Sequence, residues 1–151
     1  MTGRLHGLGA VADRYDAFLF DMWGCIHDGL RVFPGVPDLM ARLRAAGKRT
    51  VVLSNAPRLV PILKRQMPGF GIPAEAFDGI VTSGEAAWQA LAKGAHGLGK
   101  SFFHVGMEAN ISDPSEIGHC EVADLADADF VLATGAAGDG TLDIEALSPV
   151  L

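Results

Sequence analysis

The residues around Asp21 constrain the fold of this chain more than any other part of its sequence. The apolar run Ala17–Phe20 is short and bulky, which is typical of a buried strand. The strand pattern stops at Asp21, and Gly24 and Gly29 prevent regular structure from continuing. Open α/β sheets place their chemistry where a buried strand ends in an irregular loop. Asp21 is therefore the candidate nucleophile.

The segment after this loop has the pattern of a strand–helix–strand unit. Apolar residues recur on one helical face between residues 37 and 47, and residues 50–53 form a second apolar run. Such a unit is right-handed and has parallel strands. We therefore expect Asp21 and Ser54 to emerge at the same edge of the sheet.

A second repeat of this pattern predicts an α/β fold with a doubly wound parallel sheet. A helix is expected at 58–66, a strand at 80–82 and another helix at 85–93, with Ser83 as its N-cap. The glycine-rich segment 94–100 is the candidate hinge to a second domain. We expect one domain at residues 1–95 and an incomplete one at 96–151.

Further short strands are expected beyond the hinge, at 102–105 and Phe130–Ala133. The acidic run Asp124, Asp127 and Asp129 is interleaved with alanine and precedes a strand. That pattern is more typical of a solvated surface than of a metal site. Residues 141–151 begin an amphipathic helix that the sequence does not complete.

Composition and charge exclude several classes of function. The formal net charge is −6 and the basic residues do not cluster beyond the pair Lys64-Arg65, which argues against a nucleic-acid partner. No apolar run approaches the roughly 20 residues of a membrane helix, and the N-terminus does not read as a signal peptide. We expect a cytoplasmic protein with no membrane partner. Cys25 and Cys120 form no disulfide framework, and Cys25 is expected to be a small buried filler.

Three motifs carry a resemblance to a known family. The block FDMWGCIHDG at 20–29 resembles the first motif of the haloacid dehalogenase (HAD)-like hydrolases. Ser54-Asn55 after a strand resembles the second motif, and the residues IVTSGEAA at 80–87 resemble the next stretch of the NagD-like capped class, subfamily IIA. The resemblance implies a Rossmann-like core followed by the start of an inserted C2-type α/β cap. The family's later lysine and acidic motifs are not found before Leu151, so the sequence resembles the N-terminal part of such an enzyme.

The resemblance also implies a chemistry for the predicted sheet edge. Asp21 would attack a phosphoryl group and form an aspartyl-phosphate, which water then hydrolyses. Mg²⁺ would be bound by Asp21 and by the backbone carbonyl of Trp23. Ser54, Asn55 and Gly24 would hold the phosphoryl group. The implied substrate is a small phosphorylated metabolite, and a homo-oligomer is possible.

Trp23 departs from the family pattern, which usually has a second aspartate at this position to protonate the leaving group. Three hypotheses follow. In the first, the leaving group of the substrate needs little protonation. In the second, His27 or Asp28 replaces the missing acid/base. In the third, the chain is a non-catalytic phosphate- or metal-binding domain, or an inactive truncated fragment. For His27 and Asp28 the favoured alternative is a β-turn, because Asp28-Gly29 is typical hairpin chemistry.

Overall fold

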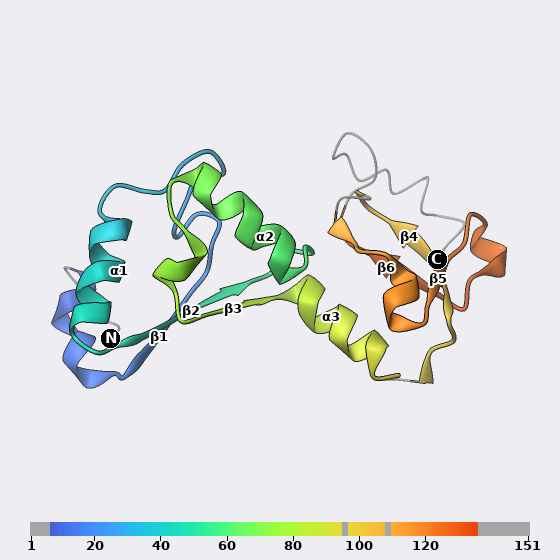
Figure 1. Cartoon of the computed structure of the whole chain (residues 1–151), viewed down its shortest axis with the longest axis horizontal. Helices are drawn as coiled ribbons and strands as arrows, with labels where there is room; N and C mark the ends of the chain where they lie inside the picture. Colours follow the sequence, from blue (N-terminus) through green and yellow to red (C-terminus); the bar gives the residue numbers. More distant parts are fainter. Residues whose placement is uncertain (1–6, 95–96, 108–109, 136–151) are drawn as a thin grey trace, which may run out of the picture. The chain divides into compact units, whose positions relative to one another are not determined.

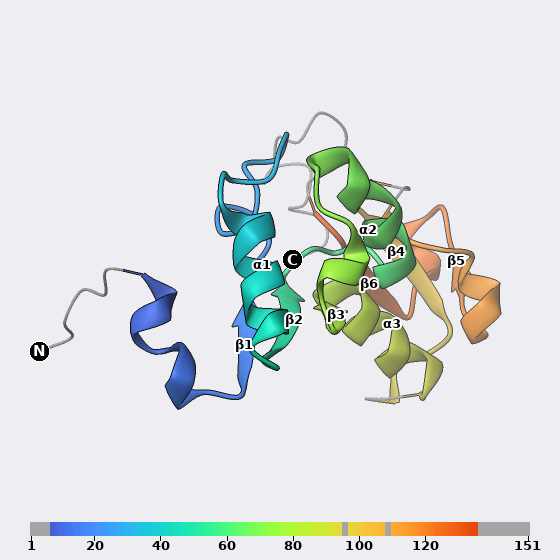
Figure 2. The same ribbon diagram turned by 60° about the vertical axis from the view of Figure 1, so that its left-hand side comes forward.

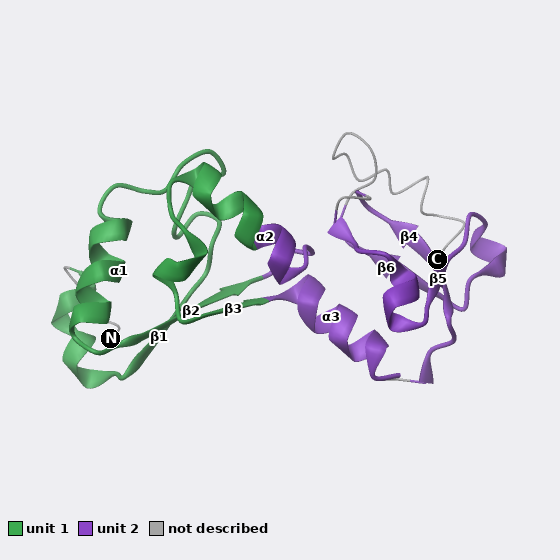
Figure 3. Ribbon diagram, viewed as in Figure 1, with its two compact units in different colours: residues 1–54, 64–81 green, residues 55–63, 82–151 purple. Residues whose placement is uncertain are grey.

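The computed structural model of the chain describes residues 7–94, 97–107 and 110–135 (Figure 1). Contacts divide the chain into two units, one of residues 1–54 and 64–81 and one of residues 55–63 and 82–151 (Figure 3). The elements in chain order are η1 (Leu8–Ala10), η2 (Ala12–Arg14), β1 (Ala17–Phe20), α1 (Val36–Ala45), β2 (Arg49–Ser54), α2 (Val60–Gln66), η3 (Met67–Phe70), η4 (Ala74–Ala76), β3 (Gly79–Thr82), α3 (Ser83–Ala92), β4 (Ser101–Val105), η7 (Pro114–Ile117), β5 (Cys120–Glu121), η8 (Leu125–Asp127) and β6 (Phe130–Ala133).

The first unit is built on a sheet with the order β1-β2-β3. β1 and β2 are parallel, with Phe18 opposite Thr50 and Phe20 opposite Val52. Helix α1 connects these two strands and contacts β2 (Figures 1 and 2). The α/β fold class and the first strand–helix–strand unit predicted from the sequence are therefore confirmed.

The two faces of this sheet differ in exposure. Phe18 and Val52 are buried on one face, and α1 buries Met40 and Leu43. The alternate positions Leu19 and Leu53 are 66% and 50% exposed. This alternation follows from the two-residue period of a strand, which sends successive side chains to opposite faces. The buried face supplies the core from which the loop after β1 projects.

The start of α3 differs from the sequence prediction in one respect. Thr82, not Ser83, is the N-cap, because the Thr82 hydroxyl accepts a 3.1 Å hydrogen bond from the Glu85 N–H. The Ser83 hydroxyl instead donates to the backbone carbonyls of Asn55 and Ala56, at 2.8 and 2.9 Å. Ser83 was expected as the cap on local preference alone, and its contacts with a distant loop decide otherwise.

The second unit contains a second parallel sheet, with the order β5-β4-β6. Its central strand β4 buries Phe102 completely, and β6 pairs with β4 over its whole length. The strands expected beyond residue 100 are thus present. The assignment of this part as the beginning of a cap, with a boundary near residue 95, stays a prediction. The helix expected at 141–151 lies outside the described residues.

The acidic run that precedes β6 has structural roles. Asp124 accepts a hydrogen bond from the Ala126 N–H at the start of η8, and Asp129 binds the N–H and hydroxyl of Ser101. In the described part of the chain, no helix is long and apolar enough to span a membrane.

Candidate active site

Asp21 directly follows β1, at the carboxyl end of the parallel pair. The register that places Phe20 opposite Val52 brings Asp21 alongside Leu53, one residue before Ser54 ends β2. The Asp21 side chain is exposed, and its Oδ1 accepts a 2.7 Å hydrogen bond from the Met22 N–H. The expectation that Asp21 and Ser54 emerge at one edge of the sheet is therefore confirmed for the strand ends.

The loop after Asp21 is organised around the backbone carbonyl of Met22. This oxygen accepts hydrogen bonds from three N–H groups, those of Cys25, Ile26 and His27, at 3.3, 2.8 and 3.2 Å. The side chains of Met22 and Ile26 are almost completely buried. The side chains of Met22 and Ile26 thus attach the loop to the core, and the Met22 carbonyl holds its turn together. Asp21 lies next to this ordered turn.

Trp23 lies on the outside of this loop, with 70% of its side chain exposed. Its indole Nε1 lies 3.1 Å from the position that a Cβ atom on Gly29 would occupy, so the missing side chain at Gly29 leaves room for the ring. A backbone bridge joins Trp23 to His27 through the Met22 carbonyl and the Gly24 N–H. The bridge therefore does not use the Trp23 carbonyl oxygen, the predicted metal ligand.

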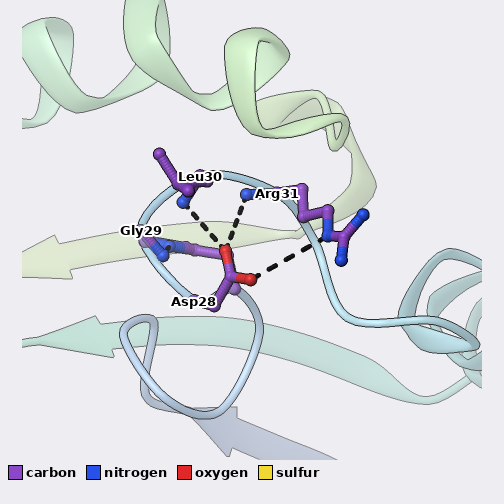
Figure 4. Close-up of polar contacts among 5 residues, drawn as sticks. Asp28, Gly29, Leu30 and Arg31 are labelled. Atoms are coloured by element: carbon purple, nitrogen blue, oxygen red, sulfur yellow. Dashed lines mark hydrogen bonds and ion pairs between the residues drawn. The ribbon is translucent and has the colours of Figure 1, made fainter.

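Asp28 closes a turn in the same loop (Figure 4). Its Oδ1 accepts hydrogen bonds from the N–H groups of Leu30 and Arg31, both at 2.9 Å, and its Oδ2 lies 4.0 Å from Arg31 Nε. The Asp28 N–H donates to the Arg31 carbonyl, and Gly29 has a φ of 98°. The backbone hydrogen bonds from Arg31 and Leu30 hold the pKa of Asp28 below its ordinary value. This is the turn that the sequence favoured.

His27 is buried below this turn, with 5% of its surface exposed. Its Nδ1 accepts a 2.9 Å hydrogen bond from the Gly29 N–H, which requires the lone pair of a neutral ring on that nitrogen. The imidazole also stacks on the ring of Phe70. Burial lowers the pKa of His27, although the nearby Asp28 carboxylate acts in the opposite direction.

The remaining predicted phosphate ligands have different surroundings. Ser54 is buried at the end of β2. Asn55, the next residue, is exposed and belongs to the second unit, where its backbone carbonyl accepts the Ser83 hydroxyl. Gly24 adopts a φ of 77°, and its N–H donates to the His27 carbonyl at 2.8 Å. That N–H is therefore already paired within the loop.

Cys25 is exposed, which contradicts the expectation of a buried filler. The Cys25 N–H takes part in the turn around Met22, and Met22 and Ile26 fill the core in its place. In a tight turn, only some positions point inward, and the larger apolar residues occupy them here.

A comparison with known families identifies the family of this chain. A family model described as haloacid dehalogenase-like hydrolase matches residues 18–119, more than half of the chain. The chain belongs to this family. The matched region of this HAD-like chain includes Asp21, the loop that follows it, and the Ser54-Asn55 pair.

Individual relatives agree with this family. The chain is 31% identical to a haloacid dehalogenase-like hydrolase from Brucella suis 1330, with a TM-score of 0.77 over 95% of this chain and 51% of that one. A NagD protein structure is 26% identical, with a TM-score of 0.66 over 90% of this chain and 51% of that one. The 4-nitrophenylphosphatase of Schizosaccharomyces pombe is 44% identical over 43 residues, which are 28% of this chain and 14% of that protein.

The HAD-like chain thus spans about half the length of the two solved structures that it matches. Their likeness confirms the NagD-like resemblance and the Rossmann-like α/β core. Sequence reasoning missed the role of Met22 in the loop of this HAD-like protein. The two apolar residues four positions apart within a glycine-rich loop, Met22 and Ile26, were the available signal.

Proposed function

We propose that the protein is a Mg²⁺-dependent phosphoryl hydrolase that acts on a small phosphorylated metabolite through Asp21. The observation that carries the proposal is the placement of an exposed carboxylate at the carboxyl end of β1, beside the end of β2. Ligands of α/β sheets bind outside this end of the strands. The names of relatives, among them 4-nitrophenylphosphatase, support phosphate esters as substrates.

The oxygen atoms present suit a hard cation. The Asp21 carboxylate and the Trp23 carbonyl are both oxygen donors, which Mg²⁺ prefers. The loop hydrogen bonds leave the Trp23 carbonyl available. Within the described ranges, no group of three His, Cys, Asp or Glu side chains gathers to hold a metal. A bound Mg²⁺ would reduce the repulsion between the carboxylate and a phosphate dianion.

In the proposed reaction, an Asp21 carboxylate oxygen attacks phosphorus in line with the leaving group. The bond from phosphorus to the leaving oxygen breaks, and a mixed anhydride forms on Asp21. Water then attacks the phosphorus of this anhydride and regenerates the carboxylate. The Ser54 hydroxyl and the Asn55 amide would donate hydrogen bonds to the phosphoryl oxygens.

The test is release of 4-nitrophenolate from 4-nitrophenyl phosphate, with and without Mg²⁺. Asp21→Asn should abolish the metal-dependent release. Asp16→Asn is the matched control, since Asp16 is an exposed aspartate at the opposite end of the same strand. Acid-quenched enzyme should carry a phosphoryl group on Asp21 by peptide mass spectrometry. Activity that survives in Asp21→Asn would contradict the role of this residue.

A phosphate-binding domain without turnover is the second candidate, and the indole at position 23 favours it because an indole cannot transfer a proton. Calorimetric titration with inorganic phosphate and Mg²⁺ separates the two. Binding without release from any phosphate ester would replace the hydrolase proposal with this one.

A further inference from the structure

A pocket in the second unit lies at the carboxyl end of its parallel sheet. Leu132 and Ala133 end β6, Thr134 follows them, and all three residues line the pocket. Strand β4 lies between β5 and β6, so the two later strands add to opposite sides of it. Open parallel sheets bind ligands outside the carboxyl ends of their strands, where the strand order reverses in this way. The pocket therefore lies where a ligand is expected.

The pocket is predominantly apolar and has room for one ring. Its volume is about 160 Å³. An apolar cavity of this order holds a benzene molecule. Helix α3 lines it with Ala87 and the half-buried Trp88, and the segment after β2 lines it with Pro57 and Leu59. An aromatic ring gains more than its apolar area when it packs against another aromatic ring, so Trp88 favours an aromatic ligand.

The lining of the pocket carries no charge. None of the described residues that line it is acidic or basic, and its polar members are Ser83, Asn110 and Thr134. A helix N-terminus attracts anions through its unpaired N–H groups. Here the Gly84 N–H at the start of α3 already donates to the Ala56 carbonyl at 3.2 Å. An ionised ligand would lose its hydration without gaining a counter-charge, so the pocket favours an uncharged one.

Asn110 gives the pocket one oriented hydrogen-bond donor. The residue is 6% exposed, and its Oδ1 accepts a 3.2 Å hydrogen bond from Arg58 Nε. Arginine has no acceptor, so this contact fixes which end of the amide is the oxygen. Nδ2 donates one of its two hydrogens to the Thr134 carbonyl at 3.4 Å. The other hydrogen can therefore serve an acceptor on a ligand in the pocket.

We propose that the second unit binds an uncharged aromatic molecule in this pocket, with the ring against Trp88 and an acceptor such as an amide carbonyl at Asn110. The described residues that line the pocket all belong to the second unit, and none belongs to the loop that carries Asp21 (Figure 3). The site therefore does not depend on the proposed hydrolase function.

Benzamide is the probe, because it carries one aromatic ring and one neutral carbonyl acceptor. Two analogues of similar size test the two requirements. Benzoate replaces the amide with a charged group, and cyclohexanecarboxamide replaces the aromatic ring with a saturated one. The Kd of benzamide should be at least about tenfold lower than that of benzoate and about threefold lower than that of cyclohexanecarboxamide.

Proton NMR titrations of the full chain follow the indole N–H signals of Trp23 and Trp88, the two tryptophans of the chain. Trp23→Phe assigns the two signals. Benzamide at about 10 mM, a concentration suited to a ligand of this size, should shift the Trp88 signal and leave the Trp23 signal in place.

Two neighbouring alanines of α3 test the location of the bound ring. Ala87 lines the pocket, whereas Ala86 is exposed and lies outside the lining. Ala87→Leu should fill the space and raise the Kd of benzamide at least about tenfold, while Ala86→Leu should leave it unchanged. Leucine is a good helix former, and circular dichroism checks that both variants fold. Ala133→Leu fills the same pocket from β6 and covers the case in which Ala87→Leu does not fold.

Each alternative outcome contradicts a stated part of the proposal. No shift of the Trp88 signal in the wild type would overturn it. Equal Kd values for benzamide in the wild type and in a folded pocket-filling variant would show that the ring binds elsewhere. Benzoate that binds as tightly as benzamide would overturn the requirement for an uncharged ligand. None of these readouts uses phosphate release, so a failure of the proposed hydrolase function would leave them unaffected.

Discussion

The carboxylate of Asp78 accepts a 2.7 Å hydrogen bond from the Thr50 N–H, while the Asp78 N–H donates to the Thr50 carbonyl at 2.8 Å. Asp78 directly precedes β3, and Thr50 lies near the start of β2. The same pair of bonds joins Asp129, which precedes β6, to Ser101 at the start of β4. Each sheet thus has an aspartate that closes the amino-terminal end of two neighbouring strands.

Removal of the Asp78 carboxylate should lower the stability of the first unit. Asp78→Ala leaves the Thr50 N–H without its acceptor, whereas Asp78→Asn keeps an oxygen at that place and should lose less. Asp38→Ala is the control, because the ion pair of Asp38 with Arg42 is exposed. Thermal melts followed by circular dichroism measure the difference. Equal melting temperatures for Asp78→Ala and the wild type would contradict a structural role for this pair.

The stability of the loop should fall as the pH decreases from about 7 toward 5. Burial lowers the pKa of His27 in the folded state below the 6.5 of an ordinary histidine, so the unfolded chain binds more protons in this range. The contribution of the buried His27 ring to the free energy of unfolding is fully present above pH 6.5. It is lost as the pH falls below that value. Urea unfolding at several pH values should show a smaller pH dependence for His27→Asn, which keeps an acceptor for the Gly29 N–H. If the free energy of unfolding depends on pH equally in the wild type and in His27→Asn, then His27 is not the source of the dependence.

The Thr82 hydroxyl should contribute measurably to stability because it makes two hydrogen bonds in a buried place. It donates to the Arg58 carbonyl at 2.7 Å and accepts from the Glu85 N–H, and the residue is 1% exposed. Thr82→Val has nearly the same volume but lacks the hydroxyl, so it should cost about 2 kcal/mol of unfolding free energy. Thr82→Ser should recover most of that loss. A Thr82→Val variant as stable as the wild type, with the loss found in Thr82→Ser, would mean that the methyl group matters instead.

Gly84 should not tolerate a side chain. A Cβ atom at this position would lie 1.8 Å from the Pro57 carbonyl oxygen, a backbone atom that cannot simply rotate away. Gly84→Ala should therefore destabilise the second unit by about 2 kcal/mol or more, although alanine normally favours a helix. Gly69→Ala, with open space around the new Cβ, is the matched control and should be close to neutral. Comparable melting temperatures for the two variants would refute the steric argument.

The hydrophobic pattern determined the position of the nucleophile candidate. The run Ala17–Phe20 specifies a strand, and the glycines after Asp21 specify where it ends, because strand formation and chain reversal depend on neighbouring residues. The expectation that this strand is buried is wrong for most of it, since only Phe18 is buried and Leu19 is 66% exposed. The parallel pairing of β1 with β2 followed from the length of the intervening helix. The turn at Asp28-Gly29 was also predictable, since its hydrogen bonds lie within four residues.

Only the tertiary structure decided the surroundings of the His27 ring and which hydroxyl caps α3. Burial lowers the pKa of His27, and the ring stacks on Phe70, which lies far along the chain. Thr82 rather than Ser83 is the cap because the Ser83 hydroxyl binds carbonyls of the segment after β2. These outcomes depend on contacts between distant residues, and local residue preference contains no information about which distant partner a polar side chain will meet.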